Sequence, residues 1–100
     1  MARKVRVEMM RRVHVFYSGR VQGVGFRVTA EDTARHLGVV GWVKNLKNSQ
    51  VEVVAEAEEA VLRKFLEVIR TGSMKNFINR ADVSWSNATD AFTEFDIRYY

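Results

Sequence analysis

The chain contains no cysteine and no proline among its 100 residues. The lack of cysteine excludes disulfides, thiolate metal sites and a cysteine nucleophile, and it is typical of proteins of the reducing cytoplasm. The lack of proline leaves glycine and hydrophobic periodicity to mark where helices and strands end. Long apolar runs are also missing, since the longest, residues 37–43, is far below the roughly 18 residues of a membrane span. We therefore expect a soluble, cytoplasmic protein with no membrane partner.

The charge of the chain is concentrated at its beginning. The net charge is +4, and residues 1–12 carry five basic side chains and one acidic side chain, which accounts for the whole excess. Residues 13–100 carry 11 side chains of each sign. Because 100 residues suit one domain, we predict a basic N-terminal arm over residues 1–12 and a single neutral domain over residues 13–100. Such an arm is more often solubilising than a contact with RNA or a membrane, which is the alternative.

Hydrophobic periodicity changes repeatedly along the chain and predicts five strands and two helices. Alternation predicts strands near residues 13–18, 39–45, 51–56, 81–85 and 95–99, and steps of three and four residues predict helices near 26–37 and 61–70. Gly38 and Gly72 follow the two helices as end signals. This order, βαββαβ with an extra C-terminal strand, predicts an α+β fold. We expect a ferredoxin-like α/β sandwich whose antiparallel sheet has two helices on one face.

Glycine is concentrated in one segment, residues 19–27, which reads Gly-Arg-Val-Gln-Gly-Val-Gly-Phe-Arg and holds three of the six glycines. Glycine lets consecutive backbone amides turn toward one anion, so the segment is suited to phosphate. Arg27 falls where a helix is predicted to begin, so its guanidinium could bind two phosphate oxygens beside the free helix amides. The alternative is a tight turn between a strand and a helix, with Arg27 in solvent. The spacing matches neither a Walker loop nor a Gly-x-Gly-x-x-Gly fingerprint.

The other residues that could act as metal ligands or nucleophiles lack the neighbouring residues that these roles require. His14 and His36 lack further ligands at metal-binding spacing, so we assign them structural roles. Ser18 and Ser49 lack the strand-turn-helix setting of a serine nucleophile. Trp42 is expected in the hydrophobic core. The sequence thus predicts no metal site and no covalent nucleophile.

Two segments together resemble the acylphosphatase family. The first is residues 19–27, and the second is residues 41–45, Gly-Trp-Val-Lys-Asn, whose asparagine follows Arg27 by eighteen residues. The closing Phe-Asp-Ile-Arg-Tyr of residues 95–99 is similar to the last strand of that family. The resemblance covers residues 13–100. It departs from the family pattern in three turns: Asn48-Ser49-Gln50, Ala57 before the second helix, and Gly72-Ser73-Met74.

The resemblance implies hydrolysis of acyl phosphates to a carboxylate and inorganic phosphate, without a metal or organic cofactor. It assigns phosphate binding to Arg27 and positioning of the attacking water to Asn45. It assigns the phosphate-binding loop to the backbone amides of Gln22, Gly23, Val24, Gly25, Phe26 and Arg27. The expected partners are a small-molecule acyl phosphate and inorganic phosphate, and the expected state is a monomer.

A non-catalytic anion- or RNA-binding ferredoxin-like module is the alternative function. RNA recognition on such a sheet uses stacking aromatic residues on an inner strand, and residues 51–56 contain none. Glu52 and Glu56 are the expected exposed positions there, and both would repel phosphates. We therefore expect no nucleic-acid partner. A third interpretation, an accessory domain of a larger enzyme, is disfavoured because the chain ends at Tyr100. The sequence does not identify the physiological acyl group.

Overall fold

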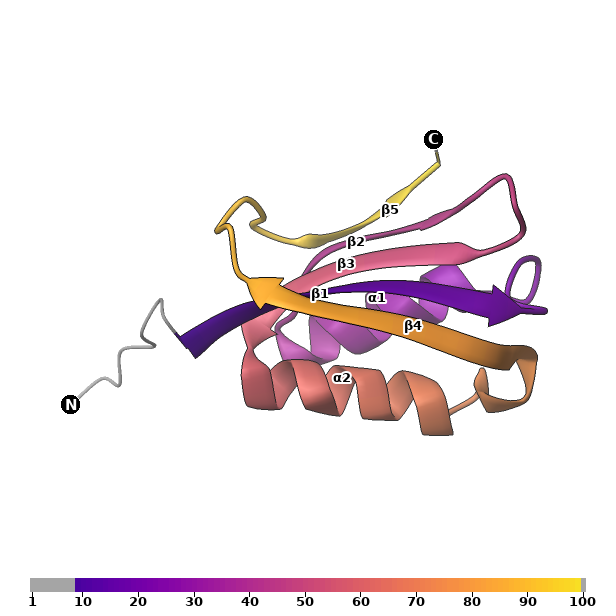
Figure 1. Cartoon of the computed structure of the whole chain (residues 1–100), viewed down its shortest axis with the longest axis horizontal. Helices are drawn as coiled ribbons and strands as arrows, with labels where there is room; N and C mark the ends of the chain where they lie inside the picture. The colour runs from indigo at the N-terminus through magenta and orange to yellow at the C-terminus, as the bar shows by residue number, and fades with distance from the viewer. Residues whose placement is uncertain (1–8, 100) are drawn as a thin grey trace.

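The computed structural model describes residues 9–99, and the predicted order of elements is confirmed. The elements are β1 (Met10–Gly19), α1 (Phe26–Leu37), β2 (Val40–Asn45), β3 (Val51–Glu58), α2 (Glu59–Thr71), the short 3-10 helix η2 (Lys75–Phe77), β4 (Ile78–Asn87) and β5 (Phe95–Arg98). Both α-helices lie on the same face of a single five-stranded sheet (Figure 1). The fold is the predicted two-layer α+β sandwich.

The strands lie in the order β4-β1-β3-β2-β5. Three of the four pairings are antiparallel, as expected, but β5 runs parallel to β2. The expectation of a fully antiparallel sheet is corrected at this edge. The reason is the connection after β4, which carries the chain from one edge of the sheet to the other, so β5 pairs with a strand of the same direction (Figure 1). The end of β5 thereby points toward the end of β2.

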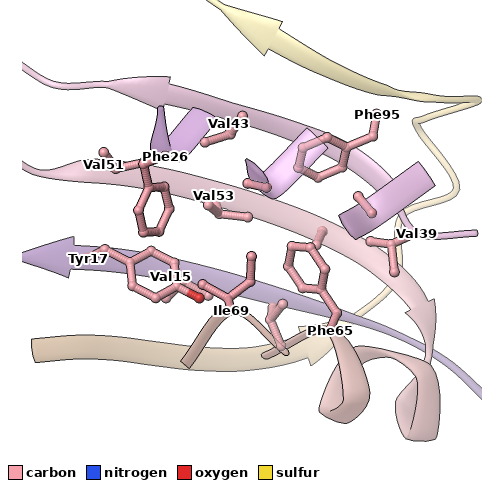
Figure 2. Close-up of a cluster of buried hydrophobic side chains, with 14 of the residues drawn as sticks. Val15, Tyr17, Phe26, Val39, Val43, Val51, Val53, Phe65, Ile69 and Phe95 are labelled. Carbon is pink, nitrogen blue, oxygen red and sulfur yellow. The ribbon is translucent and has the colours of Figure 1, made fainter. Parts of the chain in front are cut away.

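The core lies between the sheet and the two helices. The alternation in β1 buries Val13, Val15 and Tyr17 on the helical side, as predicted. Phe26, the first residue of α1, is 2% exposed and its ring centroid lies 4.9 Å from that of Tyr17 (Figure 2). Burial of such a side chain contributes about 1.5 to 3 kcal/mol. The beginning of α1 is therefore anchored by packing.

The first strand begins earlier than the sequence predicts. Because β1 starts at Met10, Arg11 and Arg12 of the predicted basic arm lie in the sheet. Their guanidinium groups form ion pairs, Arg11 with Glu59 at 3.1 Å and Arg12 with Glu56 at 2.7 Å. These two arginines are structural parts of the domain. Residues 1–8 of the predicted arm lie outside the described residues.

Trp42 is not a core residue, contrary to expectation. It alternates with the buried Gly41 and Val43 and so lies on the sheet face that no helix covers. The cation of Arg98 lies 4.7 Å from the centroid of its ring, and the ammonium of Lys44 lies 5.3 Å away. A tryptophan in a strand can lie on either face of a sheet. Here cation–π contacts with the two neighbouring cations stabilise the ring on the partly exposed face.

Glu56 is not exposed, contrary to expectation; only 2% of it is accessible. Its Oε2 accepts hydrogen bonds from Nε of Arg12 at 2.7 Å, from the backbone amide of Thr89 at 3.0 Å and from Oγ1 of Thr89 at 2.8 Å. Its Oε1 accepts from the amide of Asp90 at 3.1 Å. Burial raises the pKa of this carboxyl, but the hydrogen bonds from Thr89, Arg12 and Asp90 outweigh burial and lower the pKa below its ordinary 4.5. Glu56 thus holds the connection between β4 and β5.

Replacement of Glu56 by glutamine should reduce the free energy of unfolding by about 2 kcal/mol or more at pH 7. Glutamine has one accepting oxygen in place of two and no negative charge, so it cannot keep the bonds to both carboxylate oxygens. The lowered pKa means that this contribution is complete above pH 4.5 and is lost as the pH falls through the pKa of the folded state. Urea denaturation should therefore show the two proteins converging in acid. Glu67→Gln, whose carboxylate is exposed on α2, is the control and should stay within about 0.5 kcal/mol. A constant difference between pH 7 and pH 3 would contradict the proposed charge effect.

Candidate active site

The glycine-rich segment forms the loop between β1 and α1. Gly23 and Gly25 have φ angles of +77° and +82°, in the left-handed region that other residues rarely adopt. A Cβ at either position would meet no atom within 4 Å. These two glycines are therefore required for the path of the backbone, and the space beside them remains open to a ligand.

The amino end of α1 faces this loop. The first bond of the helix runs from the amide of Thr29 to the carbonyl of Gly25 at 3.0 Å, so the amides of residues 26–28 have no partner within the helix. Among residues 9–99, no side chain caps this end, and the first turn contains no acidic residue. Free amides and the positive end of a helix dipole favour an anion here.

The structure brings Arg27 and Asn45 together. Arg27 belongs to the first turn of α1, and Asn45 is the last residue of β2. Both line one hollow of about 90 Å³, and its remaining walls come from Val21, Gly23, Gly25, Phe26 and Val28. This volume is roughly that of three water molecules and suits one small tetrahedral anion. Within the described part of the chain, Arg27 forms no ion pair with a carboxylate.

The six predicted loop residues have different positions. Gly23, Gly25, Phe26 and Arg27 line the hollow, whereas Val24 packs against the core. Gln22 has a role that the sequence did not suggest: its Nε2 donates to the carbonyls of Leu46 and Gln50, both at 2.8 Å. One amide side chain therefore fastens the glycine-rich loop to the turn that follows Asn45. No short-range pattern signals this contact, because its partners are 24 and 28 residues away.

The turn after Asn45 closes without a glycine. Ser49 takes a φ of +76°, and Asn48 Oδ1 accepts from the amide of Gln50 at 3.1 Å. The Gln50 side chain donates to Oγ of Ser18 at the end of β1, at 2.9 Å. The turn is thus tied to both sides of the site. Of the other two departures, Ala57 is buried in β3 and residues 72–74 lead into η2.

Tyr99 is a neighbour of the site that the sequence analysis did not single out. Its ring centroid lies 4.9 Å from the guanidinium carbon of Arg27. The parallel register pairs Lys44 with Arg98, so the next position along the two strands places Tyr99 beside Asn45. The loop after β1, the turn after β2 and the end of β5 all meet at this end of the sheet (Figure 1). The motif 95–99 could have suggested this residue, but only with the parallel pairing known.

The two histidines lie elsewhere. On the open sheet face, Nε2 of His14 lies 2.6 Å from Oε2 of Glu52, and His36 lies 4.0 Å from Asp32 on the surface of α1. Across residues 9–99, no group of three or more potential metal ligands is found. A larger hollow of about 380 Å³ between α2 and β4 has neither a glycine loop nor a helix amino end at its walls. In the described region, no helix combines the length and apolar character needed to cross a membrane.

Comparison with known proteins agrees with the geometry. The acylphosphatase family model matches residues 13–97. An acylphosphatase of Roseiflexus sp. (strain RS-1) is 42% identical over 88 residues, covering 88% of this chain and 95% of the relative. One from Salinibacter ruber is 40% identical, with 88% and 93% covered. The crystal structure of acylphosphatase from Bacillus subtilis superposes with a TM-score of 0.83 at 34% identity, covering 89% of this chain and 99% of that one. The chain belongs to the acylphosphatase family.

Proposed function

We propose that this protein hydrolyses acyl phosphates to a carboxylate and inorganic phosphate. The observation that carries the proposal is the meeting of Arg27 and Asn45 in one anion-sized hollow at the amino end of α1. Family membership supports the same activity. The non-catalytic anion- or RNA-binding module is not favoured, because the relatives named above are acylphosphatases.

The phosphoryl group would occupy the hollow. The backbone amides of residues 22–27 and the guanidinium of Arg27 would bind its three outer oxygens, where negative charge is concentrated during transfer. Tyr99 holds one side of the guanidinium by a cation–π contact, which leaves the N–H groups available to oxygen. Binding would therefore be strong before any bond is broken.

Asn45 would hold the attacking water. Its amide can donate and accept hydrogen bonds but cannot act as a base, so it orients the water in line with the bond that breaks. The water oxygen bonds to phosphorus, the carboxylate departs with the electron pair of the P–O bond, and the proton passes to a phosphate oxygen. A carboxylate is a stable leaving group, so no general acid is required. This accounts for a site with only two polar side chains at its centre.

The deciding experiment is release of inorganic phosphate from benzoyl phosphate by the purified full chain. We expect turnover in the presence of a strong metal chelator, because the proposed mechanism uses amides, Arg27 and Asn45 alone. His36→Ala, an exposed change on α1 away from the hollow, is the control and should keep full activity. A folded but inactive protein would refute the proposed hydrolysis, and loss of activity with the chelator would refute the metal-free mechanism. We also propose that the protein acts as a cytoplasmic monomer without a nucleic-acid partner.

A further inference from the structure

Large apolar side chains that remain exposed are few, and two of them lie at the candidate site. Among the described residues, the exposed large hydrophobic side chains are Met9, Val28, Val83 and Tyr99. Val28 is 62% exposed and lines the hollow, and Tyr99 is 76% exposed and contacts Arg27. Isolated exposed apolar residues need no explanation, but here one lines the hollow and the other packs against the guanidinium that lines it, which marks a surface suited to an apolar ligand.

The size of the hollow leaves the acyl group outside. A space of about 90 Å³ suits the phosphoryl group, so the carbon part of the substrate must lie against the residues at its mouth. Val28 follows Arg27 in the first turn of α1, and Tyr99 reaches the same guanidinium from the end of β5. One aliphatic side chain at the hollow and one aromatic side chain beside its arginine therefore come from two different segments of the chain.

The ring of Tyr99 is available for a second contact. The Arg27 guanidinium contacts the ring, yet three quarters of the surface of Tyr99 remain accessible to solvent. Stacked aromatic rings gain free energy beyond that of the surface that they bury. A planar acyl group attached to a phosphate in the hollow would extend out of the hollow past its mouth. An acetyl group has no ring to stack against Tyr99, and a charged acyl group would lose hydration there.

We propose that Val28 and Tyr99 form the subsite for the acyl group and select apolar, planar aromatic acyl phosphates. The proposal deepens the function proposed above and rests on it for turnover, although its binding preference is independent of chemistry. Selectivity comes from the contact of the ring with the acyl group, whereas the phosphate contacts are common to all substrates.

Two ratios test the proposal. The first is kcat/KM for benzoyl phosphate over acetyl phosphate, and the second is the affinity for benzylphosphonate over methylphosphonate by calorimetry. Tyr99→Ala should lower both ratios about tenfold and Val28→Ala about threefold. One methylene in an enclosed pocket discriminates by roughly 10- to 200-fold, and both side chains are largely exposed, so the effects should be at or below the low end of that range. The change in kcat/KM should come mainly from KM. Tyr99→Phe keeps the ring and should retain both ratios. Val83→Ala, an equally simple truncation on β4 away from the hollow, is the matched control.

Each result separates the two proposals. An equal loss on benzoyl and acetyl phosphate in Tyr99→Ala would overturn the subsite, because the ring would then act only by orienting Arg27. Equal affinity of the wild-type protein for the two phosphonates would overturn it as well. A wild-type protein that prefers benzylphosphonate through Tyr99, yet hydrolyses neither acyl phosphate, would support the subsite and refute the proposed hydrolysis.

Discussion

Arg27→Ala should abolish nearly all turnover and weaken phosphate binding at the same time. The guanidinium lines the hollow and, among residues 9–99, forms no ion pair that would divert it from a substrate. A hydrogen bond between charged groups contributes about 1.5 to 3 kcal/mol, so loss of a two-bond contact should cost at least about 3 kcal/mol, or 10²-fold in affinity. Calorimetry with inorganic phosphate and steady-state kinetics with benzoyl phosphate measure the two effects.

Arg27→Lys is the sharper version of this experiment. Lysine keeps the positive charge but lacks the planar pair of N–H groups, and an ammonium also makes a different contact with the Tyr99 ring. We expect no more than a small recovery of phosphate affinity relative to Arg27→Ala. Near-normal affinity in the lysine variant would show that charge alone binds phosphate and that the bidentate geometry is unimportant.

Asn45→Ala should lower the rate by about 10²-fold or more while phosphate affinity stays close to that of the wild type. The proposed partner of Asn45 is the water, and removal of one preorganised polar contact at a reacting centre has an effect of this scale. The loop amides and Arg27 remain in place, since Gln22 fastens the loop through backbone carbonyls and not through the Asn45 side chain. Single-turnover rates beside phosphate calorimetry make the comparison.

Asn45→Asp should be as poor as the alanine variant, although its shape is nearly that of asparagine. The carboxylate brings negative charge beside the anionic substrate and removes the amide donor. If Asn45→Ala lost phosphate binding in proportion to its rate, Asn45 would be a phosphate ligand or a turn residue, and the water-positioning role would fail.

Local patterns in the sequence were sufficient for most of the architecture. The apolar steps after Phe26 and the glycine after Leu37 predicted α1 with the bounds that the structure shows, and Gly38 takes the expected left-handed conformation. These signals act over three or four residues, so they can be read without tertiary structure. The pairing of Arg27 with Asn45 was predicted by resemblance to a family and not by periodicity.

The contacts that escaped prediction all depend on distant partners. Glu56 alternates like an exposed strand residue, and only the connection after β4 turns it into a buried hydrogen-bond acceptor. Gln22 and Tyr99 likewise gain their positions from segments far along the chain. The direction of β5 follows from a crossover that leaves no signal in its four residues.

Because β5 pairs with β2 in parallel, the preference of the proposed subsite among acyl groups depends on whether the end of β5 stays paired. Phe95 is 1% exposed and anchors the beginning of β5 beside Phe65, with ring centroids 6.1 Å apart (Figure 2). The exposed Tyr99 directly follows the end of this edge strand. Strand ends of this kind open locally far more often than cores unfold. While the end of β5 is detached, the loop amides, Arg27 and Asn45 stay on the elements that carry them, but the aromatic wall of the proposed acyl subsite is gone. Warming should therefore lower the ratio of kcat/KM for benzoyl phosphate over acetyl phosphate, at temperatures where the domain is still folded and active.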